Sequence, residues 1–152
     1  MTQTITSFEG AHALGPFRAR QLLERLQSLN DRVARLDARY VHLVWSDQPP
    51  SAQLQQQLAA LLDYGEPYTG TTEGALVVVT PRLGTVSPWA SKATDIAHNC
   101  ALDVHRIERV VEYRIGLKSG LLGRSQLSAP QLQALAGELK AKYDGKRPLF
   151  VG

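Results

Sequence analysis

Two long stretches of the chain, 33–45 and 105–117, alternate between apolar and polar residues. Leu36, Ala38 and Tyr40 alternate with Arg35, Asp37 and Arg39 in the first, and Val111, Tyr113, Ile115 and Leu117 alternate with Glu112, Arg114 and Gly116 in the second. A period of two is typical of a β-strand that has one buried face and one face in water. The pattern therefore predicts two long strands that belong to a sheet with a charged outer face.

Four further stretches carry apolar residues at helical spacing. The first helix is predicted to begin at Pro16, which suits the first helical position, and to end at Asn30 and Asp31. Ser51 and Ser128 are predicted N-caps, and the third helix is predicted at about 91–101. The four apolar stripes are Leu22, Leu23, Leu26 and Leu29; Leu54, Leu58, Leu61 and Leu62; Ala93, Ile96, Ala97 and Cys100; and Leu132, Leu135, Ala136 and Leu139.

Short apolar stretches at 5–8, 75–79 and 149–151 add three strands to the pattern. The order strand, helix, long strand, helix, strand then occurs twice, in pseudo-repeats of about 4–80 and 75–152 that share the middle strand. Two sequences recur loosely between these halves: Arg35-Leu36-Asp37 as Arg106-Ile107-Glu108, and Ser51-Ala52-Gln53-Leu54 as Ser128-Ala129-Pro130-Gln131-Leu132. The chain is therefore expected to form a single α+β domain of 152 residues.

Composition narrows the class of protein. The net charge of +3 comes from scattered Arg and Lys without basic runs, which gives weak support to nucleic-acid binding. The single cysteine excludes an internal disulfide and fits a reducing compartment. No apolar run approaches the roughly 18–20 residues that span a bilayer, and the first residues do not resemble a signal peptide. We therefore expect a cytoplasmic protein without a membrane partner.

The stretch that joins the strand at 75–79 to the next helix is the most informative part of the chain. It combines prolines, a glycine, hydroxyl groups and a lone tryptophan, and a loop of this kind at a strand end is a common place for function. Ser87 and Ser91 are interpreted as helix caps. For Trp89 two alternatives stay open, packing against its own core or insertion into a partner. Lys92 and Asp95 lie either on a solvated face or in an inter-domain contact.

Catalytic and metal-binding patterns are absent from the sequence. The chain has no phosphate-binding glycine motif, and its four histidines lack metal-ligand spacing. Cys100 lies on a predicted apolar helix face, so we interpret it as a small buried side chain rather than a nucleophile. From the residues alone we predict no catalytic residue and no metal site.

The same stretch closely resembles a motif of the long-chain phosphoribosylformylglycinamidine synthases, which make formylglycinamidine ribonucleotide from formylglycinamide ribonucleotide, ATP and glutamine. The motif here reads Thr80-Pro81-Arg82-Leu83-Gly84-Thr85-Val86-Ser87-Pro88-Trp89-Ala90-Ser91-Lys92-Ala93-Thr94-Asp95-Ile96-Ala97-His98-Asn99-Cys100-Ala101-Leu102. It departs from the family at Ala90, where serine is usual, and at Ala101, where glycine is usual. Weaker similarity includes Tyr40-Val41-His42, Leu61-Leu62-Asp63-Tyr64-Gly65 and Arg106-Ile107-Glu108-Arg109. The resemblance covers about 8–117 and fades afterwards.

The resemblance implies the N-terminal domain of this ligase and glutamine amidotransferase. That domain is similar to two fused PurS subunits, which implies a two-layer pseudo-dimer with a shared, mainly antiparallel sheet and helices on one face. The ATP and Mg²⁺ site and the glutaminase cysteine belong to downstream domains that this chain lacks, so no cofactor is expected here. Whether the chain is an excised domain, a truncation or a diverged stand-alone relative stays open.

The function implied by the resemblance is that of a non-catalytic scaffold that bridges the synthetase and glutaminase domains. The residues expected to contact those domains are Arg82, Ser87, Pro88, Trp89, Ser91, Lys92, Thr94, Asp95 and Asn99. Two alternatives are an independent anion- or RNA-binding α+β module and, with least support, an autonomous enzyme.

Overall fold

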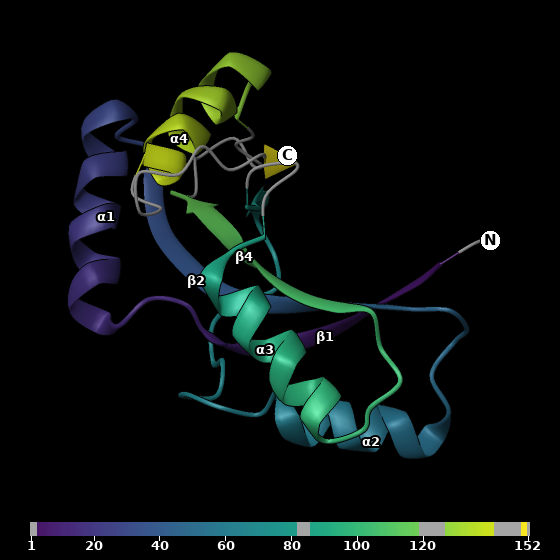
Figure 1. The fold of residues 1–152 in the computed structure, drawn as a ribbon. Helices are drawn as coiled ribbons and strands as arrows, with labels where there is room; N and C mark the ends of the chain where they lie inside the picture. The colour runs from purple at the N-terminus through teal and green to yellow at the C-terminus, as the bar shows by residue number, and fades with distance from the viewer. Residues whose placement is uncertain (1–2, 82–85, 119–126, 142–149, 152) are drawn as a thin grey trace.

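A computed structural model describes residues 3–81, 86–118, 127–141 and 150–151 (Figure 1). Its elements are β1 (Thr4–His12), α1 (Pro16–Leu29), β2 (Val33–Ser46), α2 (Ala52–Leu61), β3 (Ala75–Val79), α3 (Pro88–Asn99), β4 (Arg106–Leu117), α4 (Ala129–Ala141) and β5 (Phe150–Val151). The predicted order of elements is confirmed. None of the helices in the described residues is long and apolar enough to cross a membrane.

The five strands form one antiparallel sheet in the order β1-β2-β4-β3-β5. The register pairs Leu36 with Ile115 and Val44 with Ile107, so the alternating apolar residues of both long strands share one face. The helices pack on that face. The α+β, two-layer architecture expected from the sequence is confirmed.

The helices cover this face in two pairs. Helices α1 and α4 lie over one half of the sheet, where Leu26 and Leu135 are fully buried. Helices α2 and α3 lie over the other half, where Leu58 and Ala97 are fully buried. Burial of these apolar stripes is the main stabilising contribution of each pair.

The internal repeat is visible near the start of each long strand, β2 and β4. Arg35 forms an ion pair with Asp37 (2.6 Å), and Arg106 forms the corresponding pair with Glu108 (3.4 Å). The sequence separation between Arg35 and Arg106 equals that between Tyr40 and Val111. Tyr40 and Val111 face each other where β2 pairs with β4. The two halves of the sheet are thus related about that pair. The exact boundaries of the two pseudo-repeats stay a prediction.

Three details differ from the expectations. Strand β1 extends to His12 instead of ending near Phe8, because its end is held by a hydrogen bond from the His12 N–H to the Glu66 carbonyl (3.0 Å). Helix α3 begins at Pro88 instead of about 91, because Ser87 caps it. Cys100, expected to be buried, is exposed at the end of α3.

The loop at 66–74 runs from α2 to β3 around the end of β1. The Tyr68 ring lies against the Arg39 guanidinium (5.5 Å), and Arg114 donates to the Gly74 carbonyl (3.4 Å). Gly74 has a φ of +99°, and a Cβ there would lie 2.7 Å from the Ile115 carbonyl oxygen. Only glycine allows this approach to β4.

Candidate functional site

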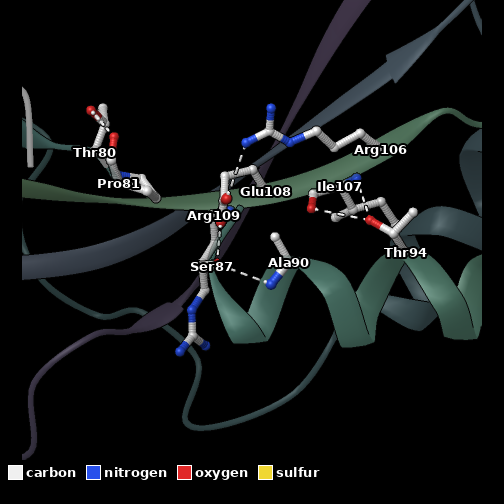
Figure 2. A network of polar contacts seen from close by, with 9 residues as sticks. All are labelled: Thr80, Pro81, Ser87, Ala90, Thr94, Arg106, Ile107, Glu108 and Arg109. Atoms are coloured by element: carbon white, nitrogen blue, oxygen red, sulfur yellow. Dashed lines mark hydrogen bonds and ion pairs between the residues drawn. The ribbon is translucent and has the colours of Figure 1, made fainter. Parts of the chain in front are cut away.

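The segment that follows β3, with Ser87 and Pro88, becomes the capped N-terminus of α3 (Figure 2). The Ser87 hydroxyl accepts a hydrogen bond from the Ala90 N–H (3.0 Å) and donates to the Glu108 carboxylate (2.9 Å). Pro88 occupies the first helical turn, where its missing N–H costs nothing. The interpretation of Ser87 as a cap is confirmed, whereas that of Ser91 is wrong because Ser91 lies inside the helix.

Helix α3 also protects the edge of β4 that extends beyond β3. The ladder of β3 ends at the pair of Val79 with Val111, so the preceding part of β4 has no neighbouring strand on that side in the described residues. There Thr94 accepts the Ile107 N–H (3.0 Å), and the Glu108 carboxylate accepts the Arg109 N–H (3.0 Å; Figure 2). Side chains thus replace the missing strand and satisfy backbone groups that would otherwise be unpaired.

Glu108 connects the helix cap to the strand. It is 3% exposed, and besides Ser87 and the Arg109 N–H it accepts a bond from the Arg106 side chain at 3.4 Å. A buried carboxylate is tolerated only when it is paired and hydrogen-bonded, as here. The carboxylate therefore fixes the position of the first turn of α3 on the sheet.

Trp89 packs against its own domain, the first of the two alternatives. The Arg109 guanidinium stacks on the Trp89 ring at 4.7 Å and on the Tyr40 ring at 4.2 Å from the ring centres, and it donates to the Tyr64 hydroxyl (3.1 Å). The His42 ring lies 5.5 Å from the Trp89 ring. We call Tyr40, His42, Tyr64, Trp89 and Arg109 the aromatic cluster. It lies between the two helix pairs and joins their cores.

Burial shifts the pKa of two side chains in the aromatic cluster, His42 and Tyr64. His42 is fully buried, and this desolvation, assisted by the charge of Arg109, lowers its pKa to about 4. Its Nε2 lies 2.8 Å from the Tyr64 hydroxyl oxygen. Burial also raises the pKa of Tyr64, while Arg109 acts in the opposite direction. Near neutral pH the cluster therefore carries one charge, that of Arg109.

The remaining predicted contact residues lie on the outer side of α3. Pro88, Ser91, Lys92, Asp95 and Asn99 are all exposed, whereas Arg82 lies outside the described residues. Beside this side, Leu61, Trp89, Ala93 and Ile96 contribute to a shallow, mostly apolar groove of about 190 Å³ between α2 and α3. The motif is thus divided between residues that fix the helix and residues that face solvent.

Sequence reasoning missed the residues that hold Trp89 and the first turn of α3. His42, Tyr64, Glu108 and Arg109 were noted for weak similarity to a family, and Glu108 also for the internal repeat, but they were assigned to no site. They come from three separate segments, and only the β2–β4 register, which faces His42 with Arg109, brings them together. The period-two pattern predicted both strands, but it does not predict their register.

The space beside Gly10 provides a test of this packing. A Cβ at Gly10 would lie 2.6 Å from His42 Cε1 and 2.9 Å from the Tyr40 carbonyl oxygen. Because such overpacking distorts a closely packed site, we expect Gly10→Ala to lower the free energy of unfolding by about 1–3 kcal/mol. Urea denaturation measures this change.

Gly137 is the matched control for Gly10. It lies in α4, and a Cβ there would meet nothing within 4 Å. Gly137→Ala is therefore expected to raise the free energy of unfolding by roughly 0.5–1 kcal/mol, the helix preference for alanine. Equal effects of the two substitutions would contradict the close packing of Gly10 on His42.

Comparison with known families confirms the resemblance noted in the sequence. A family model described as formylglycinamide ribonucleotide amidotransferase N-terminal matches residues 39–143, more than two thirds of the chain. The match begins within β2 and ends after α4, and so includes α3 and all five residues of the aromatic cluster.

Proposed function

The chain belongs to the formylglycinamide ribonucleotide amidotransferase N-terminal family, and on that premise we propose that it is a non-catalytic scaffold of phosphoribosylformylglycinamidine synthase. In this role it bridges the glutaminase domain, which releases ammonia, and the synthetase domain, which uses it, in purine biosynthesis in the cytoplasm. ATP and Mg²⁺ would bind to the other domains.

The division of α3 into a fixed side and an exposed side carries the proposal. Ser87, Trp89 and Thr94 attach the helix to β4 and to the aromatic cluster. Lys92 and Asp95 stand on the opposite, exposed side. A surface held rigid before binding loses little conformational entropy on docking, which favours affinity. We infer that this exposed side, together with Arg82, contacts the other domains.

Reconstitution in trans tests the bridging role. The 152-residue chain is mixed with a long-chain synthase that lacks its own N-terminal domain, and glutamine-dependent product formation is followed. We expect the chain to restore activity. No restoration by a chain shown to be folded would contradict a scaffold that works without a covalent link.

A double charge reversal tests the docking side. Lys92→Glu combined with Asp95→Lys preserves the net charge and changes only exposed groups. We expect it to raise the concentration needed for half-maximal restoration by at least about tenfold, which corresponds to roughly 1.4 kcal/mol. The free energy of unfolding should stay within about 0.5 kcal/mol, as for other surface changes.

The control is the same reversal on α1, Arg20→Glu with Glu24→Lys, which also changes two exposed residues. It should leave the restored activity unchanged. If both reversals weaken restoration equally, net surface electrostatics and not the exposed side of α3 determines docking.

The alternative of an RNA- or anion-binding module receives less support from the charges of the sheet. On the face opposite the helices, Arg35 pairs with Asp37, Arg39 pairs with Glu112 (3.0 Å), and Arg114 lies 3.5 Å from Glu112. Arginines neutralised in this way offer little attraction to phosphates. We expect no oligonucleotide binding at low salt, and binding with a steep salt dependence would favour the alternative.

A further inference from the structure

The exposed edge of β1 differs from the free stretch of β4, whose backbone groups are satisfied by side chains. The free stretch of β4 is covered by Thr94 and by the carboxylate of Glu108, and the edge of β3 carries β5 at Val78 and Val79. In the described residues β1 pairs only with β2. On its outer side, a backbone hydrogen bond is made at its last residue, where the His12 N–H donates to the Glu66 carbonyl. The stretch Thr4–Phe8 is therefore an uncovered edge; Figure 1 shows β1 as the last strand of the sheet.

The internal repeat indicates what this edge accommodates. Strand β3 occupies the position in the second half that β1 occupies in the first, since each precedes a helix that begins with proline and each pairs with a central long strand. An antiparallel strand, β5, lies on the outer side of β3. The equivalent place beside β1 holds no strand among the described residues.

The composition of Thr4–Phe8 favours pairing. Its residues are Thr, Ile, Thr, Ser and Phe, which are mostly β-branched or aromatic, and it contains no charge and no proline. Natural edges are usually protected from pairing by lysine, proline or a bulge. The only irregularity of β1 falls between Glu9 and His12, beyond this stretch.

The exposure of an apolar side chain on β1 also favours the pairing of another strand with this edge. Ile5 is 56% exposed, and in register it faces Trp45, which is half-buried on the same side of the sheet. A strand added beside β1 would cover part of Ile5 and extend the row of side chains begun by Trp45. Both the backbone groups and the side chains therefore gain from an added strand.

We propose that this edge binds β1 of a second copy of the chain. The two strands run antiparallel about a twofold axis near Thr6, so that Ile5 of one copy faces Ser7 of the other and the two sheets become continuous. Self-pairing is favoured because an uncharged segment centred on Thr6 faces itself without like-charge repulsion. This inference is independent of the proposed function.

Sedimentation velocity of the full chain, from about 1 µM to about 1 mM, tests the proposal over the range of weak to moderate dissociation constants. We expect the wild-type chain to pass from monomer to dimer. Ile5→Lys with Ser7→Lys should remain monomeric, because lysines then face each other across the pair. Ile5→Glu with Ser7→Glu should remain monomeric for the same reason, and an equimolar mixture of the two variants should dimerise.

The control Gln53→Lys with Gln56→Lys adds the same charge to the exposed side of α2 and should dimerise like the wild type. Circular dichroism and urea denaturation establish that all variants are folded. A wild-type chain that stays monomeric throughout, or a lysine variant that dimerises as well as the control, would overturn the proposal. Loss of dimer in both charged variants without recovery in the mixture would overturn the register about Thr6.

Discussion

The Glu108→Ala variant is expected to unfold with a free energy roughly 3–5 kcal/mol below that of the wild type, the range found when one partner of a buried ionic group is removed. The reason is the number of groups that Glu108 satisfies. Without its carboxylate, the Ser87 hydroxyl and the Arg109 N–H lose their acceptor, and Arg106 loses an ion pair. Chemical denaturation at neutral pH measures the change.

Glu108→Gln separates hydrogen bonding from charge and volume. The amide oxygen can still accept from Ser87 and from the Arg109 N–H, so we expect a loss of about 1–2 kcal/mol, much smaller than for alanine. Losses of equal size for the two variants would show that the charge, and not the accepted bonds, stabilises the attachment of α3 to β4. A loss below about 1 kcal/mol for alanine would contradict the network itself.

Acid is expected to destabilise the fold through His42. Because burial lowers the pKa of His42 from 6.5 to about 4, the unfolded chain binds a proton at this residue in a range where the folded chain does not. Stability from this group is therefore complete above pH 6.5, falls as the pH drops towards 4, and changes no further below that. The total contribution is about 3 kcal/mol, from 1.36 kcal/mol per pKa unit.

The His42→Phe variant isolates this contribution. It keeps an aromatic ring between Trp89 and Tyr64 but removes the titrating group. The difference between the unfolding free energies of the two proteins, measured at several pH values from 4 to 7, cancels the groups that they share. We expect the difference to shrink or to reverse in favour of the variant as the pH falls, and a difference independent of pH would contradict the buried neutral His42.

Local sequence signals predicted most of the elements of this fold. The alternation in 33–45 and 105–117 predicted β2 and β4, and Ser51 and Ser128 were correctly expected as N-caps, with Ser128 accepting the Gln131 N–H at 3.3 Å. These signals succeed because they depend on residues close together in the chain. The start of α3 was missed because the choice between Ser87 and Ser91 as the cap depends on Glu108, which lies on another element.

The sequence by itself determined the class of fold, the order of its elements, the internal repeat and the family, since each depends on local periodicity or on a contiguous motif. Only the tertiary structure decided which side of α3 faces solvent and what holds Trp89. Arg109 and Tyr64 are distant from Trp89 in the chain, and antiparallel pairing of β2 with β4 places Arg109 opposite His42. Apolar alternation defines which face of a strand is buried, but the register and the docking of the helices come from packing of the whole domain.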